Sequence, residues 1–131
     1  MKLLNPKTHG YIDCVIVALF LLAPTLFNFV DGAAASISYT MGILILAVAL
    51  LTAYPLGVIK AIPFTVHGWI EFAASIALIA MPGIAGFGYD DRAQNFFVGM
   101  GLVAFGFWAL SDYKVEAPSR SWAVHHGLAR G

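Results

Sequence analysis

The feature that most restricts the fold of this chain is a series of four apolar stretches, each about 20 residues long and joined by short polar connections. A helix rises about 1.5 Å per residue, so about 20 residues cross the roughly 30 Å hydrocarbon core of a bilayer. Each stretch therefore predicts one membrane-spanning helix. The expected spans are residues 10–30, 36–54, 64–82 and 93–111.

Composition agrees with a membrane protein. Hydrophobic residues make up 60% of the 131 residues and charged residues only 11%, whereas about a quarter of the residues in soluble domains are charged. The formal net charge is zero, so nothing indicates a nucleic-acid partner. We expect an all-α, four-helix bundle whose first partner is the lipid bilayer.

An internal repeat divides the chain. The matched pairs, about 58 residues apart, are His9 and His67, Gly10 and Gly68, Asp13 and Glu71, Pro24 and Pro82, and Phe29 and Phe87. They predict two tandem helical hairpins, residues 1–60 and 61–112, followed by a polar tail over residues 113–131. Each unit contains an even number of spans, so a pseudo-two-fold axis along the membrane normal is expected to relate the two units.

Basic residues predict the orientation. The amino terminus, the second connection and the tail share one side, which holds Lys2, Lys7, Lys60, Lys114, Arg120 and Arg130, while the other side holds only Arg92. The positive-inside rule then places both termini in the cytoplasm of a bacterial inner membrane. A cleaved signal peptide is the alternative for the first stretch, but that stretch is longer than a signal core and has a mid-chain counterpart.

Each unit begins with a histidine and a carboxylate four residues apart, which places the two side chains on one face of a helix. His9 and Asp13 open the first span, and His67 and Glu71 open the third. An ionisable group at this depth is costly unless it faces the bundle interior, water or a partner. These four residues are therefore the candidate binding or proton-relay site near the cytoplasmic face.

Several roles for this site remain open at the level of sequence. The pairs can form a purely structural clasp between helices. Alternatively, His9, Asp13, His67 and Glu71 can ligate a divalent metal, His9 and His67 can ligate a haem, or the carboxylates can relay protons or bind a small cation or solute. The sequence predicts no particular cofactor.

Other residues have expected places. Tyr54 and Tyr113 fall near span ends, which is typical of the aromatic belt at a membrane interface. Small residues, among them Gly42 and Gly101, are expected where helices approach closely, although the sequence assigns no specific pair.

The second unit also resembles a known family. Its Met81-Pro82, Gly86-Phe87, Ala93-x-Asn95 and Gly99 are similar to the SPW-repeat family of small bacterial membrane proteins. Of the family's Ser-Pro-Trp, only Pro24 and Pro82 are present here. The resemblance covers roughly residues 9–112 and implies a four-helix fold; it implies no activity and no catalytic residues.

The function we expect is that of an accessory or packing subunit of a membrane assembly, associating with other membrane subunits or with itself. The alternatives are a proton-coupled or small-solute carrier that uses Asp13 and Glu71, and a metal- or haem-binding redox component. No nucleophile triad, phosphate-binding loop or cysteine pair is present. The sequence favours a non-enzymatic role and leaves enzyme activity open.

Overall fold

The computed structural model describes residues 3–113 of the chain. Its regular elements are four helices: α1 (Pro6–Leu26), α2 (Gly32–Leu51), α3 (Phe64–Ile84) and α4 (Asp91–Leu110). All four are long and apolar enough to cross a membrane, which indicates a multi-pass membrane protein. The predicted polar tail lies outside the described residues, apart from Tyr113 at its start.

The first helix lies about four residues earlier than the span expected at residues 10–30. Pro6 takes the first helical position, and the Asn5 side chain accepts a hydrogen bond of 2.9 Å from the backbone N–H of Thr8. Past Leu26, Asn28 has a φ of 50°, a left-handed conformation that stops the helix. The early start places His9 in the first turns of α1.

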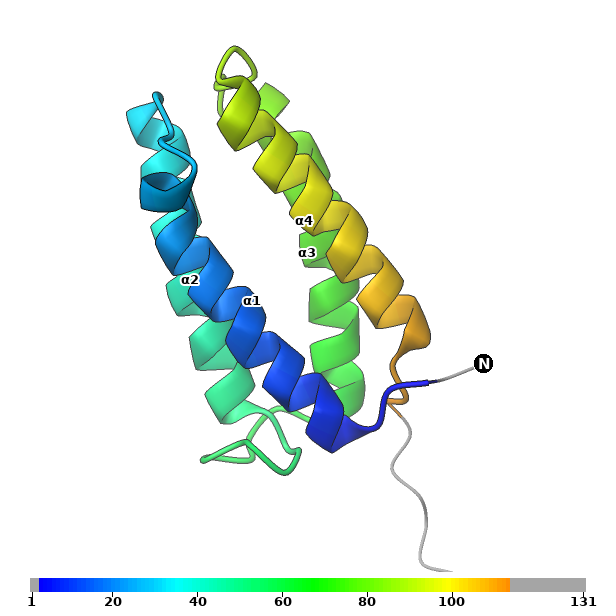
Figure 1. Cartoon of the computed structure of the whole chain (residues 1–131). Coiled ribbons are helices and arrows are strands. Elements are labelled where there is room, and N and C mark those ends of the chain that lie inside the picture. The colour runs from blue at the N-terminus through cyan, green and yellow to red at the C-terminus, as the bar shows by residue number, and fades with distance from the viewer. Residues whose placement is uncertain (1–2, 114–131) are drawn as a thin grey trace, which may run out of the picture.

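The helices form two hairpins that lie side by side, α1 with α2 and α3 with α4 (Figure 1). The short turns at residues 27–31 and 85–90 lie at one end of the molecule, which we call the turn end. The amino-terminal segment and the connection from α2 to α3 lie at the opposite end, which we call the connection end. The hairpins therefore run in the same sense.

Within each hairpin the helices cross closely at a glycine. A Cβ atom on Gly42 of α2 would lie 2.8 Å from Leu21 of α1, and one on Gly101 of α4 would lie 2.6 Å from Ile79 of α3. No side chain larger than hydrogen fits there without displacing a neighbour. The small residues of the sequence thus include two that set the spacing of the hairpins.

Two braces and an aromatic core join the hairpins. At the turn end, the Asp90 carboxylate accepts hydrogen bonds from the backbone N–H groups of Val30 (2.6 Å) and Asp31 (2.9 Å). At the connection end, the backbone N–H of Leu3 donates to the carbonyl oxygen of Leu110 at 2.7 Å. Phe20 lies between these braces, fully buried against aromatic rings of α4.

The outer surface is apolar on all four helices. Leu22, Ile43, Ile76 and Leu102, one from each helix, are 53–61% exposed. A bilayer solvates such side chains without the free-energy cost that water would impose. Most of the buried polar residues lie at the connection end, namely His9, Asp13, Thr52, His67 and Ser111.

Candidate functional site

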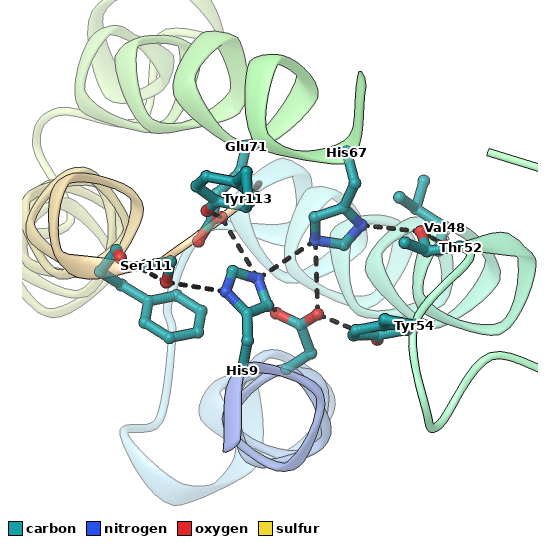
Figure 2. Close-up of polar contacts among 10 residues, drawn as sticks. His9, Val48, Thr52, Tyr54, His67, Glu71, Ser111 and Tyr113 are labelled. Atoms are coloured by element: carbon teal, nitrogen blue, oxygen red, sulfur yellow. Dashed lines mark hydrogen bonds and ion pairs between the residues drawn. The ribbon is translucent and has the colours of Figure 1, made fainter. Parts of the chain in front are cut away.

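The four residues predicted from the sequence come together at the connection end, between α1 and α3. Figure 2 shows the imidazole rings of His9 and His67 meeting edge to edge, with their Nε2 atoms 3.3 Å apart. His9 Nε2 lies 3.5 Å from Asp13 Oδ1 and 3.4 Å from Glu71 Oε2. His67 Nε2 lies 3.4 Å from Asp13 Oδ2. The two histidines and two carboxylates thus form one compact cluster.

The cluster is enclosed by protein. His9 is fully buried, and Asp13 and His67 are 4% and 5% exposed. The His9 ring stacks on Phe107 with ring centroids 4.1 Å apart and meets Phe64 edge-on at 5.1 Å. These contacts fix the plane of the imidazole, so its Nε2 atom points at a defined place.

The second nitrogen of each imidazole, Nδ1, contacts a hydroxyl that also donates to a backbone carbonyl oxygen. The Ser111 hydroxyl donates to the carbonyl oxygen of Phe107 at 2.8 Å, so toward His9 Nδ1, also at 2.8 Å, it offers only a lone pair. We therefore assign the ring proton of His9 to Nδ1, which donates to Ser111. In a neutral ring, this leaves His9 Nε2 without a hydrogen.

The same geometry holds His67. The Thr52 hydroxyl donates to the carbonyl oxygen of Val48 at 2.6 Å and faces His67 Nδ1 at 2.8 Å. We make the same assignment for His67, with the proton on Nδ1, so that Nε2 of the neutral ring carries no hydrogen. The two Nε2 lone pairs face the same small space from opposite sides.

Two tyrosines hold the carboxylates. The Tyr54 hydroxyl donates to Asp13 at 3.1 Å, and the Tyr113 hydroxyl donates to Glu71 (Figure 2). Burial, and then the charge of Asp13, raises the pKa of Tyr54 above its ordinary value of 10.0. Burial, and then the charge of Glu71, does the same for the pKa of Tyr113. Both phenols therefore remain protonated donors.

These tyrosines correct one expectation drawn from the sequence. Tyr54 was expected in an interfacial aromatic belt, but it is only 4% exposed and faces the site. Tyr113, assigned to the tail, lies against Glu71. Thr52 and Ser111 also contact the cluster, beyond the four site residues predicted from the sequence. A signal was present, because each of these two pairs keeps an interval of about 59 residues, close to that of the histidines.

The cluster brings together nitrogen and carboxylate acceptors, and no described lysine or arginine side chain joins them. Two bare Nε2 atoms and two carboxylates converge, whereas the described lysine and arginine side chains, Lys7, Lys60 and Arg92, are all exposed. Acceptors placed together in a buried site repel one another unless positive charge lies between them. The ligand atoms of His9, His67 and Glu71 all lie within 4.8 Å of one another, as one bound cation requires.

No protein-family model, curated protein or solved structure matches the chain.

Proposed function

We propose that this chain is a multi-pass inner-membrane protein that binds one divalent metal ion between its hairpins, with zinc as the expected ion. His9 and His67 bind through Nε2 and Glu71 through its carboxylate, while Asp13 contacts the two imidazoles through different oxygens and lies beside the three ligands. One observation carries the proposal: two Nε2 atoms meet two carboxylates in a buried space, while the Nδ1 atom of each ring lies against a hydroxyl.

The spacing of the cluster fits a metal. Zinc binds imidazole nitrogen and carboxylate oxygen at about 2.0–2.2 Å, which places neighbouring ligands of a tetrahedral site roughly 3.3–3.6 Å apart. His9 Nε2 lies 3.3 Å from His67 Nε2 and 3.4 Å from Glu71 Oε2, and the three ligand atoms all lie within 4.8 Å of one another. Movement of His67 and Glu71 toward each other would bring all three ligand atoms to the spacing of a zinc site.

The surroundings of the cluster also resemble those of metal sites. Ligating histidines generally donate their other ring N–H to an oxygen acceptor, which fixes the tautomer. Ser111 and Thr52 are such acceptors here, and Tyr54 and Tyr113 orient the carboxylates. With two neutral imidazoles, two carboxylates and one divalent ion, the site carries no net charge, which lowers the cost of burying it.

The other candidate functions have less support. Two axial imidazoles of a haem stand about twice a metal–nitrogen bond apart, roughly 4 Å, on opposite sides of a flat ring. His9 and His67 are closer than this, and Phe107 and Phe64 pack against His9. A carrier that uses Asp13 and Glu71 has no specific observation in its favour. The expected accessory-subunit role stays a prediction, and metal binding is compatible with it.

We also infer a tandem duplication with a pseudo-two-fold axis along the membrane normal and cytoplasmic termini. Paired contacts support the duplication: His9 with Ser111 matches His67 with Thr52, and the bridge between Leu4 and Ser111 matches the one between Thr52 and Ile62. The distribution of basic residues supports the orientation. The metal would then lie near the cytoplasmic face.

Elemental analysis of protein purified in mild detergent tests the metal site. After incubation with zinc and removal of the excess, we expect about one zinc per chain in the wild type and only background in His9→Ala and Glu71→Gln. Asp91→Asn, at an exposed carboxylate in the first turn of α4, should keep its zinc. Folded wild-type protein that retains no zinc, iron or manganese would refute the proposal.

A further inference from the structure

A cavity of about 280 Å³ begins at the candidate metal site and runs between the two hairpins. Asp13, His67 and Glu71 line one end of it, and apolar side chains of all four helices line the rest, among them Ile16, Met41, Leu78 and Met100. A small apolar cavity with a few polar groups at one end is typical of a ligand site.

The cavity borders the lipid-facing surface between α2 and α3. Leu44 of α2 and Ile70 of α3 both line it, and they are also 53% and 40% exposed. A molecule dissolved in the bilayer can therefore reach the cavity sideways, without passing through water. Its apolar part would lie toward Phe20 and Leu78, deeper along the helices, and its polar end against the carboxylates.

The net charge of the metal-loaded site determines which kind of polar head group the ligand can have. With a divalent ion in place, two carboxylates and two neutral imidazoles leave no net charge. A carboxylate or ammonium group would then bring an uncompensated charge into an apolar cavity, which is costly. A hydroxyl or carbonyl group is neutral, and its oxygen can approach the metal ion, because a zinc ion held by three protein ligands keeps a fourth position open.

We propose that this cavity binds a lipid-soluble molecule with an apolar body and a neutral hydroxyl or carbonyl head, whose oxygen contacts the bound metal. The proposal rests on the metal site proposed above. It makes the metal the polar anchor of a ligand that enters from the bilayer, beyond any part the ion has in holding the hairpins together.

Photolabelling with an eight-carbon primary alcohol that carries a diazirine on its chain tests this. In zinc-loaded wild-type protein we expect saturable labelling of cavity residues such as Met41 and Met100, mapped by peptide mass spectrometry. Ala74→Phe fills the cavity, and Ala77→Phe adds the same ring one turn along α3 on the exposed face. The first should reduce labelling at least about tenfold, and the second should leave it unchanged.

The head group is tested with matched probes. A diazirine alkane of equal length and a diazirine alkylammonium should label the zinc-loaded protein at least about tenfold more weakly than the alcohol. Labelling that is equal for all three probes, or strongest for the ammonium, would overturn the proposed head group. Labelling of the same residues in Ala74→Phe would overturn the cavity.

Zinc content is measured on every sample, which separates the two proposals. Zinc-loaded protein that is never labelled contradicts the ligand site and leaves the metal site standing. Folded protein without zinc contradicts the metal site, and the ligand proposal with it. Should Ala74→Phe fail to retain zinc, Ala104→Leu on α4 narrows the same cavity from the other hairpin and takes its place.

Discussion

The Nε2 atoms of His9 and His67 face each other across 3.3 Å, and neither carries a hydrogen in the tautomers that we assign from the contacts with Ser111 and Thr52. Two lone pairs at this distance repel, and two carboxylates add negative charge beside them. A positive ion at this point converts the repulsion into ligation. The tautomers assigned from the Ser111 and Thr52 hydroxyls therefore underlie the proposed binding of a metal ion.

The first prediction concerns these hydroxyls. Thr52→Val removes the acceptor for His67 Nδ1, leaves a buried N–H unpaired and frees the ring to change tautomer. Zinc affinity, measured by competition with a chelator, should fall roughly 10- to 100-fold. Thr40→Val is the matched control, because the exposed Thr40 hydroxyl makes a similar bond to the carbonyl oxygen of Ser36. Equal zinc affinity in the two variants would argue against the assigned tautomer.

The second prediction concerns the tyrosines. Tyr54→Phe removes the hydrogen bond that orients Asp13, and bonds to a charged group contribute about 1.5–3 kcal/mol. We expect zinc affinity to fall roughly tenfold or more by the same chelator assay. Tyr39→Phe, at an exposed tyrosine of α2, should bind zinc as the wild type does. If both variants bind equally well, Tyr54 does not support the site.

The third prediction concerns helix packing. A methyl group at position 101 would meet Ile79 at 2.6 Å and the backbone oxygen of Ser75 at 2.8 Å. Gly101→Ala should therefore lower the free energy of unfolding by about 1–3 kcal/mol, measured by denaturant titration in detergent. Gly106→Ala, with nothing within 4 Å of the added atom, should be neutral or slightly stabilising. A neutral Gly101→Ala would mean that the hairpin can open at little cost.

The fourth prediction concerns pH and the turn end, outside the spans. The hydrogen bond from Tyr89 and the backbone N–H of Ala34 lower the pKa of Asp31 below 3.8. Burial opposes ionisation of Asp90, but backbone N–H groups of Asp31, Ala93 and Val30 outweigh it, so the pKa of Asp90 is also lowered. The stability that these carboxylates provide is present above pH 3.8 and is lost as the pH falls through the lowered values.

Asp90→Ala tests this linkage by removing the brace between Asp90 and the first hairpin. The variant should unfold more easily at neutral pH, and its stability should change less than that of the wild type between about pH 6 and pH 3. Asp91→Ala, at the exposed neighbour, should keep the wild-type pH profile. The same acid loss in Asp90→Ala and wild type would exclude the brace as its source.

Periodicity and composition were sufficient to predict the helices, because the bilayer leaves a chain of this kind few alternatives. The convergence of His9, Asp13, His67 and Glu71 was also predictable, since the repeat places the two pairs at the same depth. The exact ends of the helices were less predictable from the sequence. The start of α1 depends on the Asn5 cap, a local hydrogen bond that apolar length does not report.

The residues around the histidines were harder to predict. Tyrosines near span ends usually face the interface, and only the tertiary arrangement turns Tyr54 and Tyr113 inward. Thr52 and Ser111 bond to the histidine of the other hairpin, a contact between segments that periodicity treats separately. Their tautomer-setting role depends on the carbonyl oxygens of Val48 and Phe107, which no side-chain pattern encodes.

The candidate site is divided equally between the two hairpins. Each hairpin supplies one imidazole, one carboxylate, one phenol and one hydroxyl, so a single hairpin contains only half of a coordination sphere. The proposed metal site therefore requires both hairpins to be assembled in the bilayer. A chain with only one hairpin inserted would expose the histidine and carboxylate of that hairpin to lipid, where an ionisable group without a partner is costly.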